Sequence, residues 1–108
     1  MVPLQQQWVA ALLSGKYKQG FKALYYNGYC CLGAADKELH LKEGNDLYLA
    51  DTYPELGLRS TDGTFELPIS VYGKEYFSLA SMNDARLSFQ DIALIIQNNW
   101  HLIFTEQV

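Results

Sequence analysis

Positive charge is scarce in this sequence, and long apolar runs are absent. The 108 residues carry 8 Lys or Arg against 12 Asp or Glu, for a formal net charge of −4. An acidic chain is repelled by phosphate backbones at long range, which disfavours general binding to nucleic acid or to anionic membranes. No window approaches the roughly 18 uncharged apolar residues of a membrane span, and the N-terminus does not resemble a signal peptide. We therefore expect a soluble cytoplasmic protein that does not bind membranes.

The sequence also lacks the spacings that known catalytic and metal chemistry requires. It has no Cys-x-x-Cys, His-Glu-x-x-His or Gly-x-Ser-x-Gly motif and no glycine-rich phosphate loop. His40 and His101 are too far apart in the sequence to indicate a triad, and the acidic residues between positions 36 and 55 do not have the spacing of a calcium loop. We predict no catalytic, metal or cofactor site, and we favour a protein that is not an enzyme.

The composition is that of a globular protein with one core. Hydrophobic residues make up 49% of the chain and charged residues 19%, and a chain of this length fits one domain spanning residues 1–108. The pattern of elements predicts the α+β class, with an N-terminal helix, two β-hairpins that form a small antiparallel sheet, a C-terminal pair of helices and a short final strand.

The first third contains the clearest helix. Apolar residues recur at helical spacing over residues 3–14, Pro3 suits the first turn, and Gly15 suits the position after the end. We expect Trp8 to anchor this helix to the core. A strand over residues 21–26 and the turn Asn27-Gly28 predict the first hairpin, and good helix formers over residues 30–39 predict a second helix.

The remaining elements are predicted from turn and capping residues. Residues 40–58 form an irregular connection, and Asp62-Gly63 predicts a second hairpin between residues 57–60 and 65–67. Pro68 confines the returning strand to an edge or ends it, and residues 69–72 form a further extended piece. Helices follow over residues 75–83 and 88–98, the latter capped by Ser88 and Asp91, and residues 101–105 form the final strand. Leu94 and Ile95 widen the apolar face of the second of these helices, so we expect it at the centre of the packing.

The stretch over residues 25–33 combines a turn, both cysteines and a dense aromatic cluster. We predict that it is a structural hub, whose members are Asn27, Gly28, Cys30, Cys31 and Gly33. A disulfide between adjacent cysteines would be strained, because neighbouring Cα atoms are only about 3.8 Å apart. Buried structural thiols are therefore the favoured interpretation, and a small enzyme that uses these thiols is an alternative.

The first 35 residues carry three lysines and no acid, whereas the rest carries five basic and twelve acidic side chains, a balance of −7. Lysine and tyrosine alternate here as in surfaces that bind nucleic acid by charge and stacking, although lysines on a solvated face explain the same pattern. The predicted binding residues, for a protein or another anionic partner, are Lys16, Tyr17, Lys18, Lys22, Tyr25 and Tyr26.

Residues 79–96 are similar to the first two helices of helix-turn-helix modules. A DNA-binding module needs a further recognition helix with basic or amide side chains. Between residue 75 and the end of the sequence, Arg86 is the one Lys or Arg. A helical hairpin in the core is therefore the favoured interpretation.

Four short blocks of the sequence form a recognisable order: Trp8 with residues 14–20, residues 29–33 (Tyr-Cys-Cys-Leu-Gly), residues 82–84 (Met-Asn-Asp) and residues 88–93. In these blocks the chain resembles a family of small uncharacterised proteins of tailed phages and prophages. The chain departs from this family after residue 33, where bulky apolar residues and often a third cysteine are replaced by Ala-Ala-Asp. The resemblance implies a phage or prophage source, in the cytoplasm of a bacterial host.

Small size and eight tyrosines favour an accessory protein that binds a host or phage protein. The alternative is a nucleic-acid-associated regulatory module that uses the lysines between residues 16 and 22. Neither the partner nor the oligomeric state follows from the sequence.

Overall fold

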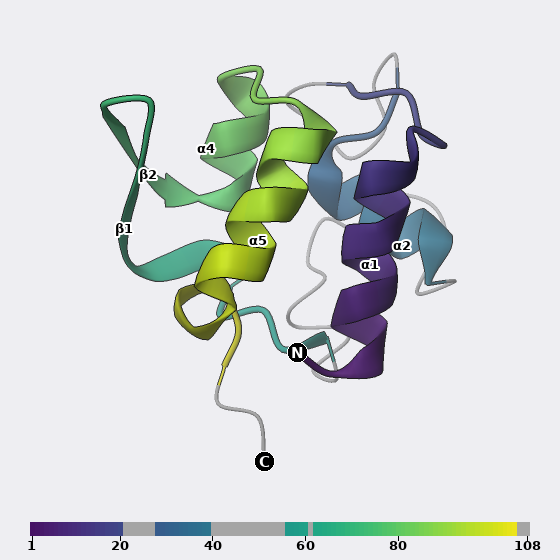
Figure 1. The fold of residues 1–108 in the computed structure, drawn as a ribbon, viewed down its shortest axis with the longest axis horizontal. Helices are drawn as coiled ribbons and strands as arrows, with labels where there is room; N and C mark the ends of the chain where they lie inside the picture. The colour runs from purple at the N-terminus through teal and green to yellow at the C-terminus, as the bar shows by residue number, and fades with distance from the viewer. Residues whose placement is uncertain (21–27, 40–55, 61, 106–108) are drawn as a thin grey trace.

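Helix α5 (Phe89–Ile103) lies at the centre of the fold (Figure 1). The computed structural model describes residues 1–20, 28–39, 56–60 and 62–105. On one side of α5 lie α1 (Pro3–Ser14) and α2 (Cys31–Glu38), and on the other side lies the hairpin of β1 (Thr64–Val71) and β2 (Lys74–Ser78). The short helix α4 (Leu79–Asp84) connects the hairpin to α5. The predicted α+β class is confirmed.

Helix α1 begins and ends where the sequence predicts. Pro3 is its first residue, and Gly15 follows its end with φ of 75°. The Trp8 side chain is fully buried, donates from Nε1 to the Cys31 carbonyl at 2.9 Å and meets the Phe104 ring edge-on at 6.2 Å. Gln5 is an unexpected member of the buried face. Its Nε2 donates to the Leu56 carbonyl at 2.8 Å, which compensates for the loss of water around the amide.

The predicted second helix is confirmed as α2, and it begins one residue after Cys30. Cys30 is its N-cap, with extended backbone, and the Cys30 Sγ accepts from the Gly33 N–H at 3.3 Å. Of the irregular connection predicted over residues 40–58, residues 40–55 are not among those that the structure describes. Its last residues are described, with Leu56 and Leu58 buried and Leu58 paired with Phe104.

The strand of the first predicted hairpin and Asn27 of its turn, residues 21–27, are not among the residues that the structure describes. At its far end, the Tyr29 N–H donates to the Lys18 carbonyl at 2.7 Å, and the Gly20 N–H donates to the Tyr29 carbonyl at 2.6 Å. This bridge is parallel, so Tyr29 pairs with the segment that precedes the predicted strand. Gly28 permits the approach, because a Cβ there would lie 2.6 Å from the Lys18 carbonyl oxygen.

The prediction of a second hairpin about Asp62-Gly63 is wrong in its position, because the hairpin of the structure joins β1 to β2. The Asp62-Gly63 turn exists, with the Gly63 N–H donating to the Ser60 carbonyl at 3.2 Å, but its carbonyls accept from the first N–H groups of α4. The segment before that turn bridges the C-terminal end instead, where Leu58 pairs with Phe104. The hairpin of the structure turns after β1, at residues 72 and 73.

Strand β1 continues through Pro68, which the sequence places at an edge or at a strand end. The edge position is confirmed, because each strand of a two-stranded sheet is an edge. Pro68 lies where the register is irregular, between Thr64 and Ile69, and such irregularities tolerate a residue without an N–H. The predicted extended piece over residues 69–72 is the second half of β1 and the start of the turn.

The prediction of a helix over residues 75–83 is wrong for its first four residues. Residues 75–78 belong to β2, where Tyr76 and Ser78 are buried and pair with Ile69 and Thr64 of β1. Ser78 then caps α4, with its Oγ accepting from the Ser81 N–H at 3.1 Å. Strand pairing with β1 outweighs the helical preference of Lys74 and Glu75.

Helix α5 begins as predicted, after Ser88, whose Oγ accepts from the Asp91 N–H at 3.0 Å. The predicted final strand is wrong except at Phe104, because α5 runs on to Ile103 across a kink at Asn99. The continuation places Ile103 and Phe104 in the buried core cluster. Within the described ranges, no helix combines the length and the apolar character needed to cross a bilayer.

Candidate functional site

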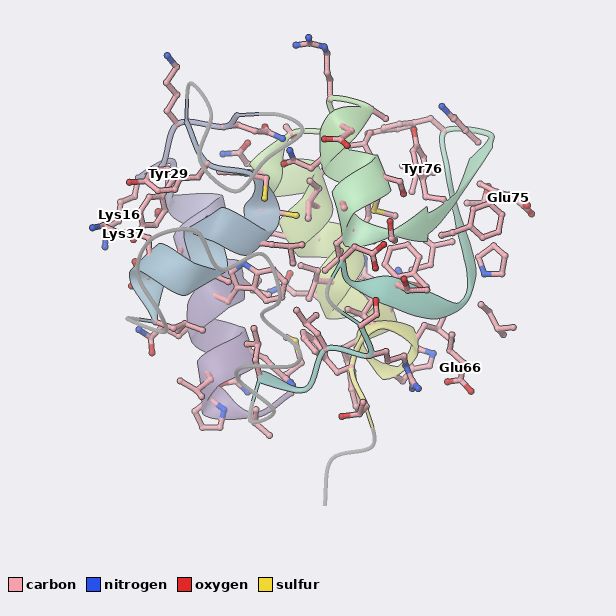
Figure 2. The ribbon with its side chains drawn as sticks, turned by 180° about the vertical axis from the view of Figure 1, so that it is seen from behind. Lys16, Tyr29, Lys37, Glu66, Glu75 and Tyr76 are labelled. Atoms are coloured by element: carbon pink, nitrogen blue, oxygen red, sulfur yellow. The ribbon has the colours of Figure 1, made fainter. Side chains whose placement is uncertain are left out.

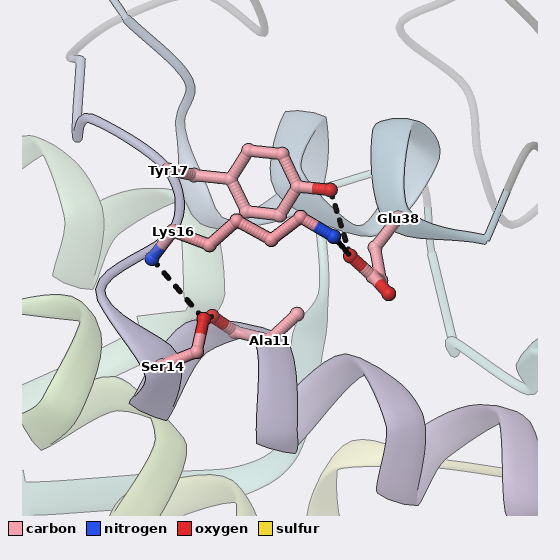
Figure 3. A network of polar contacts seen from close by, with 5 residues as sticks. All are labelled: Ala11, Ser14, Lys16, Tyr17 and Glu38. Atoms are coloured by element: carbon pink, nitrogen blue, oxygen red, sulfur yellow. Dashed lines mark hydrogen bonds and ion pairs between the residues drawn. The ribbon is translucent and has the colours of Figure 1, made fainter.

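The predicted lysine and tyrosine stretch begins in a polar cluster that links the end of α1 to α2 (Figure 3). The Lys16 ammonium lies 2.8 Å from Oε1 of Glu38, and the Tyr17 hydroxyl donates to the same oxygen at 2.7 Å. The Lys16 N–H donates to Oγ of Ser14 at 3.1 Å, which holds the turn after α1. Both predicted side chains are therefore engaged with a carboxylate of the protein itself.

The titration of these groups follows from the shared oxygen. Hydrogen bonds from Lys16 and Tyr17 lower the pKa of Glu38 below its usual value, because they stabilise the carboxylate. The hydrogen bond and the charge of Glu38 raise the pKa of Lys16. Partial burial raises the pKa of Tyr17, and its hydrogen bond to Glu38 acts in the same direction. The cluster is an ion pair with a neutral phenol at physiological pH.

The rest of the predicted stretch is divided. Lys18 is exposed, whereas Lys22, Tyr25 and Tyr26 lie outside the described residues. Tyr29 was not predicted to belong to this site, but its ring contacts that of Tyr17 edge-on at 5.3 Å. Figure 2 shows Tyr29 beside Lys16 and Lys37 at one end of the molecule, far from Glu66, Glu75 and Tyr76.

Among the predicted hub residues, Cys30, Cys31 and Gly33 lie together at the start of α2, all of them buried. Both cysteines are free thiols. Burial raises the pKa of Cys30 and raises that of Cys31 well above its usual value, so both stay protonated at neutral pH. No group of three metal-ligating side chains occurs in the described parts of the chain. Asn27 lies outside those parts, and Gly28 is the close-contact glycine at Lys18.

A buried junction around Asn83 was not predicted. This α4 side chain is fully buried, and its Oδ1 accepts from the Cys31 N–H and from Gln19 Nε2, both at 3.1 Å. Its Nδ2 donates to the Gly20 carbonyl at 2.7 Å. Asn83 thus joins α4 to α2 and to the segment after α1. No local signal reveals this role, because the partners lie 52 to 64 residues away in the sequence.

The opposite side of the molecule exposes large apolar side chains. Leu67 and Phe77 are each 60% exposed on the hairpin, and Tyr72 is 84% exposed at its turn. On α5, Leu94 is 50% and Trp100 is 40% exposed. Exposed apolar side chains that form a contiguous patch mark binding sites, so these residues are the candidates for an interaction surface.

A cleft of about 310 Å³ lies between this hairpin and α5. Residues 69–72 form one wall, and Leu94, Ile95 and Asp91 contribute to the other. The sequence contained a signal for this site, since Leu94 and Ile95 make the apolar face of α5 wider than one stripe. The expectation of a central helix is met, but the extra width lines an open cleft, with Leu94 half exposed.

The described residues define a small α+β protein. At one end Lys16 and Tyr17 bind Glu38 of the same chain, and on the hairpin side large apolar side chains are exposed. The chain belongs to a family described as a domain of unknown function, DUF8296, whose model matches residues 2–73. The match covers α1, α2 and β1 and ends at the hairpin turn. No curated protein and no solved structure matches this chain.

Proposed function

We propose that this protein is a non-enzymatic accessory protein of phage or prophage origin that acts in the cytoplasm of a bacterial host by binding another protein. The exposed apolar surface of the hairpin and α5 carries the proposal. Aromatic and large apolar side chains contribute most of the free energy in protein interfaces. The phage source is supported by the sequence resemblance described above.

The test is capture of a partner from a lysate of the bacterium whose genome carries the gene. The bait is the wild-type chain, and the matched variants are Phe77→Ser on the hairpin and Leu13→Ser on α1, where Leu13 is 40% exposed. We expect a specific partner that the Phe77 variant loses and the Leu13 variant keeps. Absence of any partner at micromolar bait, or equal capture by both variants, would overturn the proposal.

A nucleic-acid-associated regulatory module is the second candidate, supported by the exposure of Lys16, Lys18 and Lys37. Figure 2 shows Lys16 and Lys37 at the same end of the molecule. The pairing of Lys16 with Glu38 weakens this candidate, because the carboxylate offsets one of these charges. Gel-shift titration with single- and double-stranded DNA and RNA at 50 and about 200 mM salt tests it. Binding that falls steeply with salt would support this candidate, and the absence of a shift at both salt concentrations would remove it.

A further inference from the structure

The cleft between β1 and α5 runs along the edge of a strand. Successive residues of a strand point to opposite faces of a sheet. Residues 69–71 of β1 and Tyr72 of the turn are consecutive and all line the cleft. Three consecutive strand residues can line one cavity only where the backbone at the strand edge borders it. The cleft therefore exposes main-chain groups as well as side chains.

The register of the hairpin identifies the main-chain groups that face the cleft. Val71 and Lys74 flank the two-residue turn, and Ser70 is opposite Glu75. Residues that flank a two-residue turn form the hydrogen-bonded pair of an antiparallel ladder, and the next pair directs its N–H and C=O groups away from the partner strand. Ser70 thus presents one donor and one acceptor at the free edge of β1. Within the described residues, no hydrogen bond joins Ser70 to α5.

This free edge is short. Pro68, two residues before Ser70, has no N–H to offer, and the register of β1 is irregular on its N-terminal side. Proline and irregular register are the features that prevent sheet edges from pairing indefinitely. The edge is therefore suited to one short extended segment and not to open-ended sheet growth.

The side chains around the edge define what such a segment should carry. Ile69 and Ile95 supply apolar walls, and the half-exposed Leu94 supplies an apolar rim. Of the described residues that line the cleft, Asp91 alone has an acidic or basic side chain. Glu66, an acidic residue of β1 that does not line the cleft, is paired with Arg59 at 3.0 Å. A basic side chain next to apolar ones complements this lining.

Tyr72 closes the end of the cleft at the hairpin turn. Its φ is 51°, in the left-handed region that non-glycine residues seldom adopt, and its side chain is 84% exposed. Asparagine or glycine is the usual residue in a turn of this kind. The turn therefore places an aromatic ring at the cleft mouth in spite of the backbone preference.

We propose that this cleft binds an extended peptide segment of the partner protein, which adds to the edge of β1 at Ser70, inserts apolar side chains between β1 and α5, and places a Lys or Arg side chain near Asp91. This inference rests on the proposed protein-binding function and names its site. Strand addition of this kind takes affinity from main-chain hydrogen bonds and specificity from the pockets for alternate side chains.

The probe is a yeast-displayed library of random dodecapeptides, sorted on the wild-type protein. We expect enriched peptides in which apolar residues alternate with others and which contain Lys or Arg. Synthetic copies should lose about tenfold in affinity for Ser70→Pro, which removes the edge N–H, and for Leu94→Ser. Asp91→Asn should weaken binding several-fold and reduce its salt dependence. Leu13→Ser is the matched control and should bind as the wild type does.

A second arm does not depend on how well the Ser70 variant folds. Alternate N-methylation of the selected peptide removes its hydrogen bonds along one edge and leaves its side chains, so binding to the wild-type protein should be lost. The inference is overturned if no peptide is enriched, if N-methylated peptides and the Leu94 variant bind as tightly as their parents, or if the wild-type chain dimerises through this cleft and Leu94→Ser is monomeric. If the lysate partner is still captured by Leu94→Ser, the cleft is not its site, although the proposed function stands.

Discussion

Two regions of the molecule differ in whether their side chains have partners within the protein. One is the end that carries Lys16, and the other is the side that carries the hairpin. At the first, the ammonium of Lys16 and the hydroxyl of Tyr17 both bind Glu38 (Figure 3). At the second, Leu67 and Phe77 of the hairpin are each 60% exposed to solvent. A charged residue in the sequence is therefore a poor guide to where a partner binds, because its charge can be paired with another residue of the same chain, as Lys16 is with Glu38.

The difference has an energetic counterpart. Polar groups at the first end and in the Asn83 junction are held by hydrogen bonds, and a buried group that loses its partner costs free energy. The exposed apolar side chains on the hairpin lack the stabilising free energy of roughly 25 cal/mol per Å² that burial of apolar surface provides. Changes at the first end and the junction should therefore affect stability, and changes on the hairpin should affect binding.

The largest effect on stability should come from Asn83→Ala. The change leaves the buried Cys31 N–H and Gly20 carbonyl without their partner and should lower the free energy of unfolding by about 3 kcal/mol. Urea denaturation followed by circular dichroism measures it. The control is Asn99→Ala, which removes one half-buried hydrogen bond to the Ile95 carbonyl and should cost less than about 1 kcal/mol. Equal losses in the two variants would contradict the role given to the junction.

The next largest effect concerns the cap of α2. Cys30→Ala removes the sulfur that accepts from the Gly33 N–H and should cost about 1 kcal/mol. Cys30→Ser keeps an acceptor at the same place and should cost less than half of that. The same denaturation experiment compares the two. A serine variant as unstable as the alanine variant would show that the thiol acts by packing and not as a cap.

A smaller effect, visible in its pH dependence, should follow Lys16→Met. The folded-state pKa of Glu38 is lowered, so its contribution is present above the usual Glu pKa of about 4.3 and is lost as pH falls through the folded value. Wild type and variant should differ slightly in urea midpoint at pH 7, and the two midpoints should converge at about pH 2. NMR titration should show the Glu38 midpoint moving up in the variant. An unchanged midpoint would mean that the ion pair does not persist in solution.

The smallest effect on stability should come from Leu67→Ser and Phe77→Ser. Both side chains are mostly exposed, so each change should alter the free energy of unfolding by less than about 0.5 kcal/mol. Capture of the protein partner should nevertheless fall with both. A loss of stability comparable with that of Cys30→Ala would show that these residues support the hairpin, which would erase the contrast between the two sides.

The helix ends that are fixed by capping residues were predicted correctly from the sequence. Pro3 and Gly15 marked the ends of α1, and Ser88 marked the start of α5, because capping acts within a few residues. Residues 75–78 were misassigned because their strand conformation depends on pairing with β1, and a helical pattern of Lys, Glu and aromatic residues does not show that pairing.

The sequence revealed some residues of the candidate sites but not their partners or surroundings. Lys16 and Tyr17 were singled out from the sequence, but no local signal indicates their partner Glu38, since 21 or 22 residues separate them. The extra apolar width of α5 at Leu94 was visible in the sequence. Whether that width faced the core or an open cleft depended on where the hairpin turned, and the turn at Tyr72 carries no usual turn residue in its first position.

Hydrogen exchange at the Cys31 N–H, which donates to Asn83, also measures how often α2 and α4 separate. The first N–H of a helix has no carbonyl partner within the helix, and here it is held by a side chain 52 residues further on. Deuterium can replace that hydrogen only when α4 and α2 separate. If the two move as one cooperative unit, exchange at this single amide should be as slow as in the middle of α5, and its rate reports how often the fold opens between its first and last thirds.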